Sequence, residues 1–121
     1  MPNKIEKFED LTVWKSSMKL TESIYKLMQN CPDFGFKNQI TRAIVSVPSN
    51  IAEGFDRQTN KEFIQFLYIA KGSISEVRTQ LYLAIKLNYI DEDNGNDLLL
   101  ETRKISAMLH NFIQTRKTKF N

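Results

Sequence analysis

The chain contains little cysteine, proline or glycine. Its 121 residues include one cysteine, Cys31, which excludes an internal disulfide and is consistent with a reducing compartment. Three prolines and four glycines leave few places for turns, so long elements are favoured over many short strands. A chain of this length can bury a core without disulfides or a metal ion. We therefore expect a single domain over residues 1–121.

Long apolar runs are missing as well. No run approaches the roughly 18 apolar residues of a membrane span. The first eleven residues, MPNKIEKFEDL, carry charges where a secretory signal would have its apolar core. These observations predict a cytoplasmic protein that does not enter a membrane. The net charge of +3 permits contact with nucleic acid without requiring it.

The sequence also lacks the residue groupings of common enzymes. The single histidine, His110, has no glutamate three residues before it, so the Glu-x-x-His pairs of di-iron bundles are missing. There is no glycine-rich phosphate loop, and nothing in the sequence joins Cys31 to a base. The sequence therefore predicts no enzyme, no metal site, no cofactor and no small-molecule substrate.

Apolar residues recurring at three- and four-residue steps predict helices in the first half of the chain. The first helix spans about 11–28, and Asp10 is placed to cap its start. The second spans about 36–53, and Gly54 is its expected stop.

Pro48 lies inside the second predicted helix. An interior proline removes one backbone donor and clashes with the preceding turn, so we expect a kink or a break near residues 44–48. The small polar side chains of Ser46, Ser49 and Asn50 are placed to satisfy backbone groups freed there.

The second half of the chain predicts two more helices. Thr59 and Glu62 have the spacing of a capping box, so a third helix begins there and runs to about Asn88. A fourth follows the acidic stretch 91–93 and frays into the basic tail 116–119. Loops this short join antiparallel neighbours. The predicted fold is therefore all-α, an antiparallel up-down-up-down four-helix bundle whose second helix is kinked near Pro48.

The third helix has two distinct faces when its residues are placed about 100° apart. Its core stripe is formed by Phe63, Phe66, Leu67, Ala70, Ile74, Val77, Leu81, Ala84 and Ile85. A second arc mixes bases with apolar and aromatic residues: Lys61, Ile64, Tyr68, Lys71, Arg78, Tyr82 and Lys86.

The second arc has two interpretations. Ile64, Tyr68 and Tyr82 lie outside the core stripe, which favours an interface between copies of the chain, although scattered surface tyrosines are common. Bases interleaved with aromatics also suit phosphate neutralisation and base stacking. Gly72, in the middle of this helix, is expected where a neighbouring helix approaches closely, with ligand contact as the alternative.

Several segments together resemble a known family. The resemblance is carried by FEDLTVWK at 8–15, QITRA at 39–43, VPSNIAEG at 47–54, the pairs EF, FL, IA and GS between residues 62 and 73, and Glu76. This pattern covers nearly the whole chain. It is similar to that of the 23S rRNA-intervening sequence protein family, whose members are also called four helix bundle proteins.

The resemblance implies a bacterial four-helix bundle that assembles as a barrel-like homopentamer, with some members encoded inside insertions in large ribosomal RNA genes. A similar bundle, the accessory protein of diversity-generating retroelements, binds a reverse transcriptase and nucleic acid through a basic surface. By that analogy Arg42, Arg57, Lys71 and Arg78 become candidate contacts here. The resemblance also draws attention to Asn50, Glu53, Arg57 and Glu76, which we expect to bond between the second and third helices and hold the Pro48 kink, with a shared functional surface as the alternative.

Two functions remain open on the sequence alone. The first is a non-enzymatic oligomeric scaffold that binds RNA or a ribonucleoprotein through Arg42, Arg57, Lys61, Lys71, Arg78 and Lys86. The second is an adaptor for a protein partner, with no role for nucleic acid.

Overall fold

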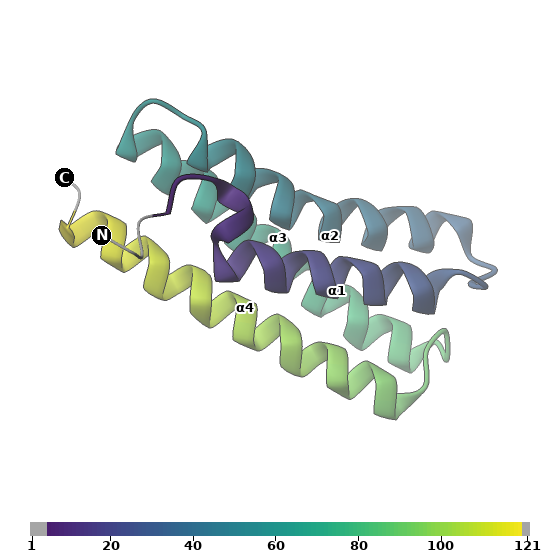
Figure 1. The fold of residues 1–121 in the computed structure, drawn as a ribbon. Helices are drawn as coiled ribbons and strands as arrows, with labels where there is room; N and C mark the ends of the chain where they lie inside the picture. The colour runs from purple at the N-terminus through teal and green to yellow at the C-terminus, as the bar shows by residue number, and fades with distance from the viewer. Residues whose placement is uncertain (1–4, 120–121) are drawn as a thin grey trace.

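The computed structural model describes residues 5–119 and folds them into four long helices (Figure 1). A short 3-10 helix, η1 (Phe8–Asp10), precedes α1 (Thr12–Met28), α2 (Phe34–Phe55), α3 (Asn60–Lys86) and α4 (Glu92–Lys119). Consecutive helices run in opposite directions, and α4 returns to lie beside α1. The antiparallel four-helix bundle is confirmed. None of the helices within residues 5–119 is long and apolar enough to cross a membrane.

The core is built mainly from isoleucine and leucine contributed by all four helices. Its most completely buried large side chains are Ile24, Met28, Ile40, Ile44, Val47, Ile51, Leu67, Ile74, Leu81, Ile105, Leu109 and Ile113. The predicted core stripe of α3 is confirmed, with Phe66 and Ile85 half-buried at its edges. These positions recur at helical spacing, so burial of one stripe per helix accounts for the bundle.

The start of α1 differs from the prediction. Asp10 belongs to η1, and Leu11 occupies the cap position without a side-chain cap. Leu11 is buried, and its amide bonds the Phe8 carbonyl at 3.0 Å. The ring of Phe8 also meets that of Trp14 edge to face at 5.4 Å. Burying these apolar residues therefore draws Asp10 into the preceding turn, and its capping role is wrong.

Helix α2 begins earlier than expected and passes through Pro48 without a break. Asp33 caps it by accepting a hydrogen bond from the Phe36 amide at 3.1 Å. Near Pro48, Ser46 Oγ lies 2.9 Å from the Ala43 carbonyl, and Asn50 Nδ2 donates to the Ser46 carbonyl at 2.7 Å. These bonds reach the carbonyls of Ala43 and Ser46 and not the Ile44 carbonyl that Pro48 leaves without its helical donor, so the predicted role of the small polar side chains is not seen. Helix α2 is continuous through Pro48, so the predicted break is wrong.

The glycines act differently from the predictions. Gly54 does not stop α2; it is buried inside it, and an added Cβ would lie 2.6 Å from Phe66 Cβ on α3. Gly72, expected to permit close approach of a neighbouring helix, is exposed and has no atom within 4 Å of an added Cβ. Gly95 is buried in α4, where a Cβ would overlap the Ile85 side chain. Close approach therefore depends on Gly54 and Gly95, and the prediction for Gly72 is wrong.

The ends of α3 and α4 are well defined. Thr59 caps α3 by accepting from the Glu62 amide at 3.1 Å, and its hydroxyl donates to the Glu62 carboxylate at 2.9 Å. Asp91 accepts a hydrogen bond from the Asn94 amide at the start of α4. Contrary to the expected fraying, the basic tail 116–119 continues α4 to Lys119.

Candidate functional site

Two tyrosines on α3 are held by cations from α4. The Tyr68 hydroxyl accepts a hydrogen bond from Lys117 Nζ at 2.5 Å, and this ammonium also lies 4.9 Å from the tyrosine ring centroid. The Tyr82 hydroxyl accepts from Arg103 Nη2 at 2.7 Å. Both tyrosines remain exposed, at 45% and 43%. Each hydroxyl is therefore fixed while much of its ring stays accessible.

Four cations on α3 lie along the same side as these tyrosines. Helical spacing places Lys61, Lys71, Arg78 and Lys86 within an arc of about 100° that also contains Tyr68 and Tyr82. Lys61 and Lys86 are exposed near the ends of the helix, whereas Lys71 and Arg78 are half-buried between them. We call the following set the basic face: Lys61, Tyr68, Lys71, Arg78, Tyr82, Lys86, Arg103 and Lys117.

Carboxylates are directed largely away from the basic face. The two acids of α3, Glu62 and Glu76, fall on its opposite flank, where Glu76 lines a shallow cavity with residues of α2. On α4, Asp97 and Glu101 line a groove beside α1. Glu92, in the first turn of α4, is the acid that helical spacing brings nearest, about 20° around the helix from Arg103. The basic face is therefore positive over most of its length.

Arg116 is partly buried, and its side chain contacts α3. Its Nε donates to Asn60 Oδ1 at 2.7 Å, Asn60 Nδ2 donates to the Arg116 carbonyl at 3.0 Å, and its guanidinium lies over the Phe63 ring at 4.9 Å. Burial lowers the pKa of this guanidinium from its usual value. Arg116 thus joins the end of α4 to the start of α3.

Two predicted nucleic-acid contacts lie apart from the basic face. Arg42 is exposed on α2 and lines the shallow cavity that contains Glu76. Arg57 follows α2, pairs with Glu53 at 2.7 Å and lies over the Phe66 ring at 4.8 Å. The six predicted cations therefore separate into four on the basic face and two beside α2. Arg103 and Lys117 complete the basic face and were not predicted, because sequence spacing does not reveal which residues of α4 face α3.

The polar residues expected to bond between α2 and α3 mostly bond locally. Asn50 bonds a carbonyl of its own helix, and Glu53 pairs with Arg57 four residues later. Within residues 5–119, the hydrogen bond that crosses between the two helices joins the hydroxyls of Ser46 and Ser73, 2.6 Å apart. Two small side chains thus form the polar connection that was expected from longer ones.

Two of the three predicted interface residues, Tyr68 and Tyr82, belong to the basic face. Ile64 is half-buried and packs against the core, while Tyr68 and Tyr82 are bonded to α4. Other exposed apolar side chains, all aliphatic, lie elsewhere on α3. We call the following set the apolar strip: Ile69, Leu83 and Leu87, exposed by 52%, 45% and 46%, together with the uncovered Gly72. Helical spacing places these residues beyond the second arc, on the side of α3 opposite its core stripe, a signal that the sequence alone offered.

Within residues 5–119, no three His, Cys, Asp or Glu side chains are grouped so that they could hold a metal ion.

Comparison with known proteins identifies the family and gives a solved structure with a similar fold. The family model for the 23S rRNA-intervening sequence protein matches residues 9–111. A protein of unknown function from the S23 ribosomal protein family of Bacteroides thetaiotaomicron VPI-5482, solved at 1.70 Å, is 27% identical in sequence. The match covers 86% of this chain and 100% of that chain, with a TM-score of 0.81. No curated protein matches the chain.

Proposed function

The chain belongs to the 23S rRNA-intervening sequence protein family, and we propose that it is a non-enzymatic, self-associating bundle that binds RNA through its basic face. The observation that carries this proposal is the meeting of six cations and two exposed tyrosine rings along α3 and α4. Of these cations, Arg103 and Lys117 come from α4 and are oriented by the tyrosine hydroxyls.

The chemistry of the basic face suits a single-stranded polyanion. Lysine and arginine gain affinity for nucleic acid by releasing counterions from phosphates. Exposed aromatic rings provide platforms on which unpaired bases stack, without requiring a particular sequence. Because Tyr68 and Tyr82 are bonded at their hydroxyls, their rings are fixed before RNA arrives.

The dimensions of the basic face favour an extended ligand over a single phosphate. Lys61 and Lys86 stand near opposite ends of α3, which at 27 residues is about 40 Å long. Cations distributed along such a length follow a backbone rather than converge on one anion. We therefore expect binding that depends weakly on sequence and strongly on salt.

A salt series with matched charge reversals tests this proposal. The first variant is Lys71→Glu with Arg78→Glu, on the basic face. The second is Lys15→Glu with Arg42→Glu, which changes the net charge equally at exposed positions elsewhere. We expect the first variant to lose at least tenfold in affinity for a single-stranded RNA oligonucleotide, and the second to lose far less. The salt slope should become shallower by about 1.4 in the first variant, because two phosphate contacts at about 0.7 each are removed.

Equal losses in the two variants would mean that net charge alone attracts RNA, and the basic face would then have no special role. Unchanged binding in the first variant would contradict the proposal directly.

Self-association, with the pentamer that the family resemblance implies, is supported by the apolar strip. Three large aliphatic side chains about half exposed on one helix favour burial against another surface. Gly72 lies within the strip, and glycine in a helix interior costs about 1 kcal/mol relative to alanine. Since no atom of this chain approaches Gly72, close approach of a second copy would account for it. Sedimentation velocity should show a particle heavier than one chain, and a monomer at micromolar concentration would refute this part.

The second candidate function is an adaptor for a protein partner. It is favoured by an uncharged cavity of about 320 Å³ between α1 and α2, whose lining includes Trp14, Met18, Val45 and Pro48. An RNA affinity unaffected by either double variant would leave this function as the better explanation of the fold.

A further inference from the structure

The side of α4 that reaches the two tyrosines carries a repeat. Arg103 bonds Tyr82, and Lys117, fourteen residues later on α4, bonds Tyr68, fourteen residues earlier on α3. The same kind of contact is therefore made twice, about 21 Å apart along the helices. Because fourteen residues are close to four helical turns, both contacts stay on one side of the bundle.

His110 stands at the midpoint of this repeat. It is seven residues from Arg103 and seven residues from Lys117, so it lies about 10 Å along the helix from each and within about 20° of both around it. Its side chain is exposed. We call Arg103, His110 and Lys117 the α4 row.

The charged groups that α3 presents toward the α4 row are basic. Lys71 and Arg78 lie half-buried on the basic face, between its two tyrosines along the chain. The acids of α3, Glu62 and Glu76, fall on the opposite flank of that helix. A phosphate that approaches His110 from this side therefore meets cations.

Acids on the other side of α4 point away from His110. Glu101 lines a cavity with Lys19 of α1, and helical spacing places it about 180° around α4 from His110. Asp10 of η1 lines another cavity with Asn111, about 100° around the helix. The side chains one turn before and after His110 on α4 are uncharged: Ser106, Ala107, Ile113 and Gln114.

We propose that His110 is a further phosphate contact of the basic face, and that RNA binding takes up a proton at its imidazole. This inference rests on the RNA binding proposed above and adds a contact to it. The neutral ring accepts a proton from solvent on its unprotonated nitrogen, and the imidazolium then donates a hydrogen bond to a phosphate oxygen. A strand lying along the α4 row would meet a cation about every 10 Å.

The sign of the pH dependence follows from this step. Histidine is the side chain that ordinarily changes its charge between about pH 5 and 8. A phosphate placed beside the ring favours its charged form, because opposite charges stabilise each other. The complex therefore holds more protons than the separate molecules, and the affinity for RNA should rise as the pH falls.

A pH series with single-stranded oligouridine tests the contact, because uracil bases do not change charge in the acidic to neutral range. Between about pH 8 and 5.5, wild-type affinity should rise about threefold or more, and the salt slope should steepen by about 0.7, the value for one added phosphate contact. His110→Gln, neutral at every pH, should lose both changes. His110→Arg, charged at every pH, should bind tightly throughout.

A matched control moves the imidazole to the neighbouring position. The double variant His110→Gln with Asn111→His places the ring about 100° around α4, beside the cavity that contains Asp10. It keeps one histidine in the chain and should not regain the pH dependence. Far-UV circular dichroism should show a folded bundle for every variant across the pH range.

Equal pH dependence in wild type and His110→Gln would overturn the contact, because the proton would then be taken up elsewhere. Recovery of the pH dependence in the double variant would overturn it as well. Wild-type binding that responds to salt but not to pH would remove the role of His110 and leave the proposed RNA binding intact. Absence of RNA binding at every pH would overturn both proposals.

Discussion

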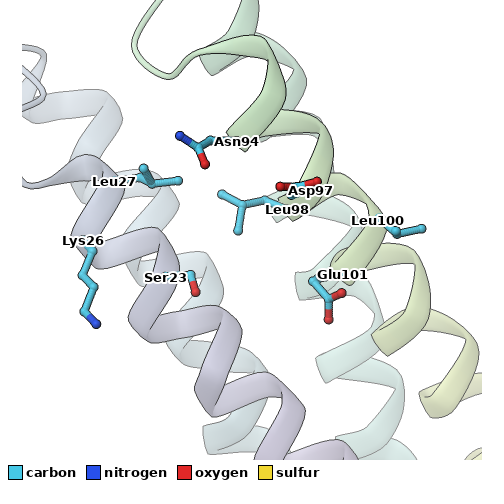
Figure 2. A pocket seen from close by; sticks show the side chains of 8 residues that line it. All are labelled: Ser23, Lys26, Leu27, Asn94, Asp97, Leu98, Leu100 and Glu101. Atoms are coloured by element: carbon cyan, nitrogen blue, oxygen red, sulfur yellow. The ribbon is translucent and has the colours of Figure 1, made fainter.

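The seam between α2 and α3 and the seam between α1 and α4 are built in opposite ways. At the α2–α3 seam, Gly54 brings the helices together against Phe66, and the Ser46 and Ser73 hydroxyls bond across it. At the α1–α4 seam, Leu27 and Leu98 line an open cavity of about 470 Å³ (Figure 2), and no ion pair joins the described residues of the two helices. The comparison teaches that one side of this bundle is optimised for internal packing, whereas another keeps surface that is suited to a partner.

Truncating one leucine of the closed core and one at the open α1–α4 seam should sharpen this comparison most. Leu67, on α3, has no exposed surface, so Leu67→Ala should leave an enclosed cavity and lower the free energy of unfolding by about 3–5 kcal/mol. Leu98→Ala removes the same atoms beside the open groove and should cost about 2 kcal/mol. Urea unfolding at one fixed protein concentration measures both, since self-association shifts apparent stability. Equal losses of stability would mean that the α1–α4 seam is packed as tightly as the core.

The two glycines should respond with opposite sign. Gly54→Ala forces a Cβ to 2.6 Å from Phe66 Cβ and should lower the free energy of unfolding by about 1–3 kcal/mol. Gly72→Ala meets no atom of its own chain within 4 Å, so at concentrations where the chain is monomeric it should raise the free energy of unfolding by about 0.5–1 kcal/mol, because alanine is the better helix former; the added Cβ should at the same time weaken self-association. The same urea titration compares them. A stabilising Gly54→Ala would contradict the described packing of α2 on α3.

The polar connection at the α2–α3 seam predicts a smaller effect. Ser73→Ala removes one partner of the Ser46 hydroxyl and should lower the free energy of unfolding by about 1 kcal/mol. Ser75→Ala, two residues away on the exposed side of α3, serves as the control and should change stability little. A double-mutant cycle with Ser46→Ala isolates the coupling between the hydroxyls. No coupling would show that the close approach depends on Gly54 alone.

The smallest predicted effect concerns the loops at the end of the open seam. Tyr89, after α3, donates a hydrogen bond to Asp33, after α1, at 2.7 Å. The Phe36 amide, and then this hydroxyl, hold the pKa of Asp33 below its usual value. A lowered carboxyl pKa in the folded state stabilises the fold above the unfolded pKa, and this contribution is lost as pH falls through the folded value.

Tyr89→Phe should therefore make stability fall less steeply on acidification below about pH 5, and Asp33→Asn should flatten the dependence further. Unfolding midpoints measured between neutral and acidic pH would test this, with Tyr25→Phe as a control on the exposed side of α1. Identical acid profiles for Tyr89→Phe and wild type would remove any role for this bond in pH dependence.

Much of the fold could be predicted because helical periodicity and capping are local properties. The four helices, the core stripe of α3 and the Thr59 cap each follow from residues within a few positions of one another. Asp10 and Gly54 were misjudged because their surroundings are tertiary. A buried Leu11 shifts the start of α1, and contact with Phe66 decides that Gly54 lies inside its helix.

The candidate site could be predicted in part. Placing α3 residues by angle grouped Lys61, Lys71, Arg78 and Lys86, because one helix fixes their relative positions. Arg42, which the family resemblance added to this group, lies on α2, along the other flank of α3. The contributions from α4 depend on how it rotates against α3, which no local pattern specifies.

The central claim is that RNA meets the basic face while the closed α2–α3 seam and the open α1–α4 seam do not take part. Backbone amide chemical shifts recorded during titration with a single-stranded RNA oligonucleotide test it most directly. We predict that the largest changes fall around Tyr68, Lys71, Arg78 and Tyr82 on α3 and around Arg103 and Lys117 on α4. Changes concentrated on α1 and α2, with α3 and α4 unaffected, would contradict the claim.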